Sequence, residues 1–224
     1  MKTSKQFKRT HALSRVSKAV ALASALVMLP MGVNHAGDEA LYGPDAPPGS
    51  AFVRLFNASS AADLDAKVGN EEISNIDSLD ASEFVFVPSG SHNLSVGSVQ
   101  KDVQLESGAY YTAVLNEDAQ ADGITVIKSE KYSNRLKALV ILYNLTDASD
   151  LSLRTVDGST SVIDPVASQS VGTREVNPAR IQLAVYQGEK KVASAPTVSF
   201  ARGKAFSLFA VGSADAPRLV WASN

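Results

Sequence analysis

The chain has 224 residues, 20% of them charged, with 23 acidic and 21 basic residues and no cysteine. The absence of cysteine excludes a disulfide framework, thiol chemistry and a cysteine-based metal site. The acidic balance disfavours nucleic acids and anionic membrane surfaces as partners.

The first 36 residues predict a secretory signal peptide. They contain six basic residues and no acidic one, and they include the apolar run AVALASALVMLPMGV at 19–33. Such a run is too short for a good transmembrane span and is typical of the apolar core of an export signal. We therefore expect cleavage after Ala36 and a soluble chain in the bacterial periplasm, with no transmembrane span. The 15 basic and 23 acidic residues that remain would give that chain a net charge of −8.

The next clear pattern, SAFVRLFNASS at 50–60, returns as KALVILYNLTDAS at 137–149. Ala51, for example, aligns with Ala138 at an offset of 87 positions. Because two further pairs of segments match in the same order, the repeat predicts an internal duplication. The further pairs are FVPSGSHNLSV at 86–96 with VNPARIQLAV at 176–185, and VQLESGAYYTAV at 103–114 with VSFARGKAFSLF at 198–209.

Both copies consist of short segments rich in valine, tyrosine, phenylalanine and threonine, bounded by glycine, proline, asparagine or aspartate. This pattern is typical of β-strands, and no segment outside the export signal shows a sustained helical period. We therefore predict an all-β chain of two tandem, homologous small β-sandwich domains joined by a short linker. The predicted boundaries are a signal peptide at 1–36, an N-terminal domain at 37–128, a linker at 129–136 and a C-terminal domain at 137–224.

The repeated strand AFVRLFN has two faces, because side chains alternate along a strand. Ala51, Val53 and Leu55 share the face that we predict to line the core. Asn57 and its counterpart Asn144 follow where the chain must turn, and an asparagine side chain can bond nearby backbone there. We interpret both as structural turn residues. The alternative is N-glycosylation, since NAS and NLT both fit the acceptor pattern.

The sequence offers no nucleophile and base of the kind that acyl transfer uses. His92 is the only histidine after residue 36, and it lies in PSGSHNLSV near Ser89 and Ser91. Adjacent residues of a strand point to opposite faces, and the chain has no G-x-S-x-G elbow. We therefore predict that the protein is not an enzyme and has no catalytic residue, no metal ligand and no cofactor.

Several stretches resemble one family over essentially the whole expected mature chain. The most specific is LYGPDAPPGSAFVRLFNA, and LVILYNLTD and ARIQLAVYQGEKKVASAPTVSFARGKAFSLFAVG agree with it. Together with the basic export signal, they are similar to the AlgF family of periplasmic alginate biosynthesis proteins. The resemblance implies two β-sandwich domains joined by a short linker and a role in O-acetylation of the exopolysaccharide alginate.

By this resemblance, the role is that of a non-catalytic periplasmic adaptor that bridges proteins of the acetylation complex, with contact to the polymer as a further expectation. The implied partners are acetyltransferases of the SGNH-like type, AlgJ and AlgX, and the membrane component of acetyl transfer. The alternative is a free-standing polysaccharide-binding module, or an esterase or transferase that handles acetyl groups.

Charge divides unevenly between the two copies. Residues 37–135 hold 16 acidic and 6 basic residues, whereas 136–224 hold 7 acidic and 9 basic residues. A polyanion such as alginate is repelled by a surface of like sign. We therefore predict that any polymer contact belongs to the C-terminal domain and that the acidic N-terminal domain docks a basic protein surface. The predicted polymer-binding residues are Arg174, Arg180, Lys190, Lys191, Arg202, Lys204 and Trp221.

Overall fold

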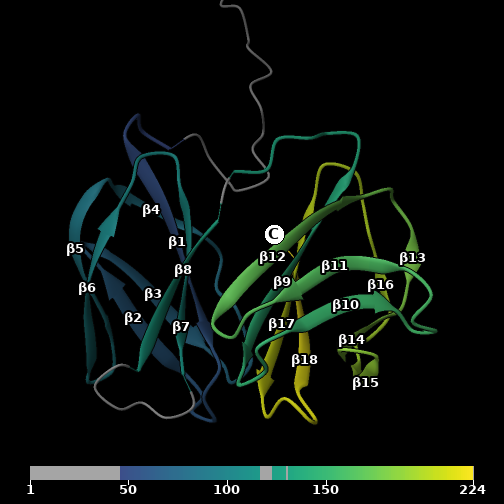
Figure 1. Cartoon of the computed structure of the whole chain (residues 1–224). Coiled ribbons are helices and arrows are strands. Elements are labelled where there is room, and N and C mark those ends of the chain that lie inside the picture. Colours follow the sequence, from purple (N-terminus) through teal and green to yellow (C-terminus); the bar gives the residue numbers. More distant parts are fainter. Residues whose placement is uncertain (1–45, 117–122, 130, 224) are drawn as a thin grey trace, which may run out of the picture. The chain divides into compact units, whose positions relative to one another are not determined.

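The computed structural model describes residues 46–116, 123–129 and 131–223 (Figure 1). The predicted signal peptide and its cleavage site lie outside these residues. All regular elements of the described chain are β-strands, so the predicted all-β class is confirmed. Within this part, no helix has the length and hydrophobicity needed to cross a membrane.

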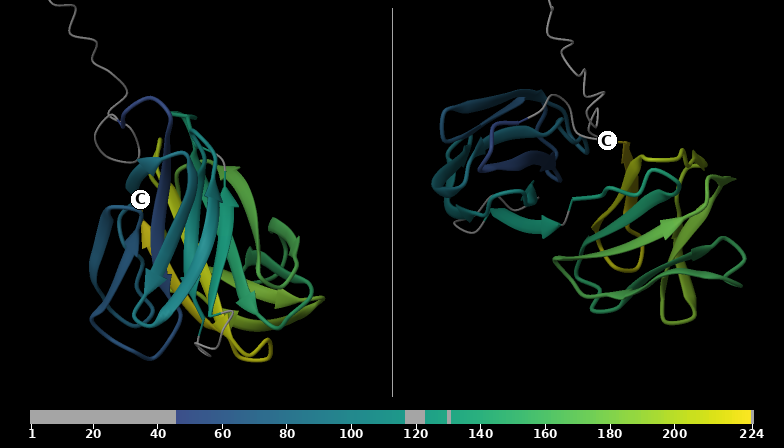
Figure 2. Two further views of the ribbon diagram at one scale, coloured as in Figure 1. Left: turned by 90° about the vertical axis from the view of Figure 1, so that its left-hand side faces the viewer. Right: turned by 90° about the horizontal axis from the view of Figure 1, so that it is seen from above.

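The N-terminal half forms two four-stranded sheets, stacked as a sandwich (Figure 2). The first sheet has the order β4 (Val85–Pro88), β1 (Ser50–Asn57), β7 (Tyr110–Leu115) and β8 (Ile124–Ser129). The second has the order β3 (Glu71–Ile76), β2 (Leu64–Val68), β5 (Gly90–Val96) and β6 (Val99–Leu105). β1 pairs antiparallel with β4 and parallel with β7.

The C-terminal half repeats this arrangement. One sheet has the order β12 (Ser170–Val176), β9 (Ala138–Thr146), β17 (Ala205–Gly212) and β18 (Arg218–Ser223). The other has the order β11 (Ser161–Val166), β10 (Leu151–Thr155), β14 (Leu183–Gln187) and β15 (Lys190–Ser194). A short additional ladder joins β13 (Arg180–Ile181) and β16 (Val198–Ser199).

The two sandwiches share one topology, strand for strand. β1 and β9 are equivalent, and each pairs in parallel with a strand near the end of its own half, β7 or β17. In the first pair Val53 lies opposite Tyr111, and in the second Val140 lies opposite Phe206. These are the residues that the sequence repeat aligns, so the prediction of two tandem homologous domains is confirmed. β8 ends at Ser129 and β9 begins at Ala138, with the linker between them.

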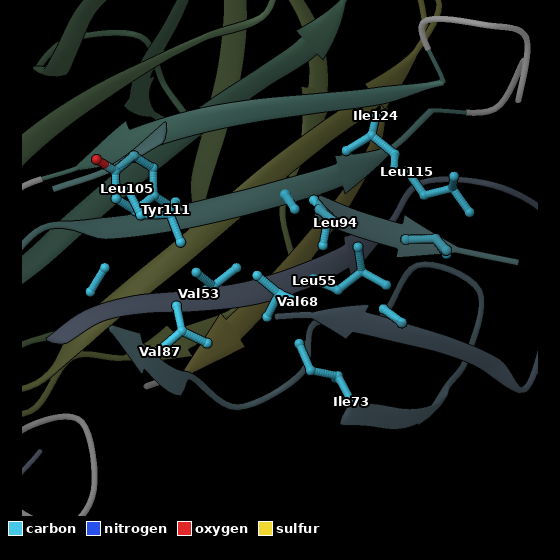
Figure 3. Packing of buried hydrophobic residues seen from close by; sticks show 14 of the residues in the cluster. Val53, Leu55, Val68, Ile73, Val87, Leu94, Leu105, Tyr111, Leu115 and Ile124 are labelled. Carbon is cyan, nitrogen blue, oxygen red and sulfur yellow. The ribbon is translucent and has the colours of Figure 1, made fainter. Parts of the chain in front are cut away.

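The core of the N-terminal sandwich lies between its two sheets. Ala51, Val53 and Leu55 of β1 point into it, and each is at most 2% exposed. Figure 3 shows Val53 and Leu55 beside Val68 and Leu94, which come from the second sheet. Removal of such apolar side chains from water is the main favourable contribution to folding. The equivalent face of β9 lines the core of the C-terminal sandwich, so the predicted core face is confirmed.

The opposite face of β1 is buried as well, because a third apolar cluster joins side chains from both halves. Phe56 of β1 stacks on Phe209 of β17 with ring centroids 3.8 Å apart, and Tyr143 of β9 stacks on Phe209 at 4.5 Å. All three side chains are fully buried. The two sandwiches therefore contact each other through the outer faces of the sheets that contain β1 and β9.

Arg54 of β1 lies in the same contact and is only 1% exposed. Its Nε donates to Thr112 Oγ1 at 3.0 Å, and its Nη2 donates to Ser207 Oγ at 2.8 Å and to Tyr143 OH at 3.4 Å. The guanidinium carbon also lies 4.8 Å from the ring centroid of Phe84. Burial of a charged group is costly unless such contacts replace water. Arg54 therefore adds polar bonds between the halves to the apolar contact.

Asn57 and Asn144 hold equivalent turns, and neither has exposed surface. Asn144 Nδ2 donates to two backbone carbonyls at 2.8 and 2.9 Å, and Oδ1 accepts from the backbone N–H and the hydroxyl of Thr146. Asn57 forms an equivalent set with Ser59 and nearby carbonyls. The structural role predicted for both asparagines is confirmed. The sequons NAS and NLT arise because the hydroxyl two residues on bonds the buried asparagine, and an amide held in this way is not accessible to a glycan.

Candidate functional site

The seven residues predicted to bind polymer lie on four strands, β12, β13, β15 and β18, and in the turn before β17. Trp221 of β18 donates its Nε1–H to Pro196 O at 3.0 Å and packs edge-on against Phe200, with centroids 5.8 Å apart. Its ring is therefore used in packing and is not a free platform for sugar. Lys190 of β15 bonds Asp215 at 2.9 Å, and this bond lowers the pKa of the Asp215 carboxyl.

The other predicted cations lie in different places. Lys191 Nζ reaches Val156 O at 3.5 Å, which is a weak contact. Arg174 lies on the edge strand β12 beside the hollow between β11 and β12. Arg180 lies on the short strand β13, exposed to solvent. Only Arg202 and Lys204 remain together, on either side of Gly203 in the turn before β17.

This turn packs against the linker, so the cations of the linker lie beside those of the turn. Gly203 N–H donates to Lys137 O at 2.7 Å, and the N–H of Leu139 donates to Lys204 O at 2.9 Å. Gly203 has a φ of +69°, and a Cβ added there would lie 3.7 Å from the Cα of Arg135. We call the surface made by Arg135, Leu136, Lys137, Arg202 and Lys204 the basic corner.

The basic corner presents its charges to solvent. Lys137, Arg202 and Lys204 are exposed, and none of their side chains has a hydrogen bond or ion pair among the described residues. Leu136 is 75% exposed and stands between two of the cations in the chain. The sequence analysis missed Arg135 and Lys137 because a polar, charged stretch between two domains is also typical of a spacer.

The linker beside the corner is held in place by its own side chains. Asn134 Oδ1 accepts from the N–H of Leu136 at 2.9 Å, and Asn134 Nδ2 donates to Glu175 on β12 at 2.7 Å. Tyr132 is buried, and this burial, followed by the nearby Glu175 charge, raises the pKa of its hydroxyl. The second half of the linker therefore belongs structurally to the C-terminal sandwich.

His92, the one histidine expected in the mature chain, lies on β5. It forms no hydrogen bond with a serine hydroxyl among residues that the structure describes. Its Nε2 is 2.7 Å from Pro88 O, so this nitrogen carries the proton. Its ring also packs over Gly69, where an added Cβ would come within 2.9 Å of Nδ1. Ser91 Oγ donates to Gln104 instead. The arrangement supports the backbone of two neighbouring turns.

Comparison with known proteins adds family information. The family model described as "Alginate O-acetyl transferase AlgF" matches residues 24–207. Proteins described as "Alginate biosynthesis protein AlgF" are similar over nearly their whole length. The one from Pseudomonas putida is 41% identical over 209 residues, covering 93% of this chain and 95% of the relative. The one from Pseudomonas aeruginosa is 37% identical over 213 residues, covering 95% and 94%.

Two solved structures are also similar to parts of the chain. The C-terminal domain of AlgF from P. aeruginosa is 42% identical, covers 40% of this chain and 99% of its own, and has a TM-score of 0.36. The N-terminal domain of the same protein is 30% identical, covers 38% of this chain and 99% of its own, and has a TM-score of 0.33.

Proposed function

The chain belongs to the AlgF family of alginate biosynthesis proteins, and from this premise we propose that it is a non-catalytic adaptor required for alginate O-acetylation. It acts in the periplasm and holds together the proteins that bring acetyl groups to the polymer. The partners in this proposal are AlgJ, AlgX and the membrane component of acetyl transfer. The hydrogen bonding of His92 is the observation that supports a non-catalytic role.

An acetyl transferase or esterase of the common type needs a base beside a nucleophile and hydrogen-bond donors for the oxyanion. His92 donates from Nε2 to a backbone carbonyl, and the hydroxyl of Ser91 bonds another side chain. The Nε2–H of His92 thus supports the backbone, and no hydroxyl in the described part of the chain is hydrogen-bonded to the ring. This supports an adaptor, although the family model carries the name of a transferase.

We expect the purified chain from residue 37 to hydrolyse p-nitrophenyl acetate no faster than the background reaction, because His92 has no hydroxyl as a hydrogen-bond partner among the described residues. The release of p-nitrophenol is followed spectrophotometrically for the wild type and for His92→Ala. Both rates should equal that of buffer containing an unrelated β-sandwich protein. Turnover above background that His92→Ala abolishes would show that the adaptor proposal is wrong.

The adaptor role itself is tested by native co-purification from periplasm. The tagged full-length chain should bring down AlgJ and AlgX in similar amounts before and after digestion of the polymer with alginate lyase. Direct protein contacts do not depend on polymer, whereas a polysaccharide-binding module would lose both partners on digestion. Recovery of neither partner from undigested periplasm would remove the basis of the adaptor proposal.

The exposed carboxylates of the N-terminal half support the prediction that this half docks a basic protein surface. Residues 63–80 contain six exposed carboxylates and one lysine, Lys67, which lies 3.6 Å from Glu72 in an exposed ion pair. The other five carboxylates of this stretch form no ion pair within the described residues, so their charges are available for steering a partner. Direct polymer contact by the C-terminal cations stays a prediction.

A further inference from the structure

We propose that the basic corner is a docking surface for an acidic protein and that Leu136 enters an apolar recess of that protein. The inference rests on the proposed adaptor function and assigns the contact to particular residues. The sequence analysis predicted that C-terminal cations bind polymer. The present proposal adds residues of the linker to the binding surface, and its ligand is a protein.

The charge of the corner supports an acidic partner. Lys137, Arg202 and Lys204 are brought together by backbone bonds between the linker and the turn around Gly203. Two other cations of this sandwich are paired, since Arg154 lies 3.1 Å from Glu189 and Lys190 lies 2.9 Å from Asp215. Arg174 and Arg180 are exposed but lie on two different strands, β12 and β13. Among the described residues, the corner therefore groups three exposed cations that form no ion pair. Complementary charge of this kind accelerates association and selects the partner.

Leu136 supports a protein partner. Within the described residues, the exposed large hydrophobic side chains are Phe86 and Leu136. Leu136 lies among cations, so it resembles the apolar centre of a contact with a polar rim. Its backbone N–H is held by Asn134, and the corner is held by Gly203 N–H, so little order has to be gained on binding.

The same features disfavour polysaccharide as the occupant. The corner has no exposed aromatic ring on which a sugar could stack, because Leu136 is its only exposed large hydrophobic side chain among described residues. Glu175, held by Asn134, places a carboxylate close to the linker. A polyuronate would be repelled by this charge, whereas a protein surface can match it with a donor.

The test places the photocrosslinker p-benzoylphenylalanine at position 136 of the full-length chain in cells that make alginate. After irradiation, the adduct is isolated and the crosslinked peptide is identified by mass spectrometry. We expect a protein adduct whose peptide lies in a segment rich in aspartate and glutamate. The same crosslinker at the exposed Thr197 of this sandwich serves as the control position and should not give that adduct.

Charge reversal in the same cells tests the electrostatic part. Arg202→Glu with Lys204→Glu should lower the adduct yield by about tenfold or more, because like charges then face each other. The matched control, Lys190→Glu with Lys191→Glu, makes the same change of net charge on β15 and should leave the yield within about twofold. Equal melting temperatures of the variants show that both remain folded.

Three outcomes would overturn the proposal: no protein adduct at position 136, an adduct to a segment without acidic residues, or an adduct insensitive to the corner reversal. A purified chain that binds oligouronate through Arg202 and Lys204 would also overturn it, in favour of polymer. If AlgJ and AlgX still co-purify with the wild type, only the corner is wrong. If they do not co-purify, the adaptor proposal itself fails.

Discussion

Asn144→Ala should lower the free energy of unfolding by about 3–5 kcal/mol, a large part of the roughly 5–15 kcal/mol that stabilises a typical domain. The fully buried side chain makes four hydrogen bonds, two of them to backbone carbonyls and one to a backbone N–H. Alanine leaves these backbone groups without partners and away from water. Each such group costs about 1–3 kcal/mol.

Urea unfolding, followed by circular dichroism, measures the loss. Asn57→Ala is a replicate in the other sandwich and should destabilise similarly, because Asn57 makes equivalent bonds. The control is Asn93→Ala, whose side chain bonds Asp102 at the surface and whose loss should cost about 0.5 kcal/mol or less. A loss below about 1 kcal/mol for both buried variants would contradict the assigned role.

Phe209→Ala should cost about 3–5 kcal/mol, because the ring is fully buried between Phe56 and Tyr143 where the two sandwiches meet. Thermal and urea unfolding of the chain from residue 37 measure the effect. The matched control is Phe86→Ala on β4, since Phe86 is 37% exposed and lies outside this contact. Its loss should be well below half of that for Phe209→Ala.

A double variant tests whether the two halves are energetically coupled. Phe56→Ala with Phe209→Ala should destabilise the chain by less than the sum of the single changes, because either change alone removes their stacking contact. Chains cut to residues 37–130 and 134–224 retain their own cores but expose this apolar face to water. We expect each to fold with lower stability than in the tandem protein. Strict additivity, with no stability lost on cutting, would show that the contact contributes nothing.

The sequence by itself determined the fold class and the duplication. Strand alternation placed Ala51, Val53 and Leu55 on one face, and period-two burial depends only on local backbone geometry. The repeat aligned Val53 with Val140, which the parallel registers of β1 and β9 confirm. Asn57 could be interpreted as a turn residue because its preference is local too. The similarity to one family was also visible in the residues alone.

Only the tertiary structure decided what covers the second face of β1. Alternation shows that Arg54 and Phe56 share a face but does not show whether another sheet covers it. The answer came from Phe209, more than 150 residues away, and from Ser207, which bonds Arg54. Contacts at such a separation leave no local pattern in a sequence, because they depend on how two finished sheets pack.

The same reason explains the candidate site. In the sequence Lys190 and Lys204 look equally available, but Asp215, distant in the chain, pairs with the first and not the second. Trp221 looks like a possible sugar platform until Pro196 O is found to accept its N–H. Arg135 and Lys137 became part of a surface only because Gly203 packs against the linker. The sequence determined which charges the chain carries. The packing of distant segments decided which of these charges remain free, because an exposed charge is available only when no neighbour in space neutralises it.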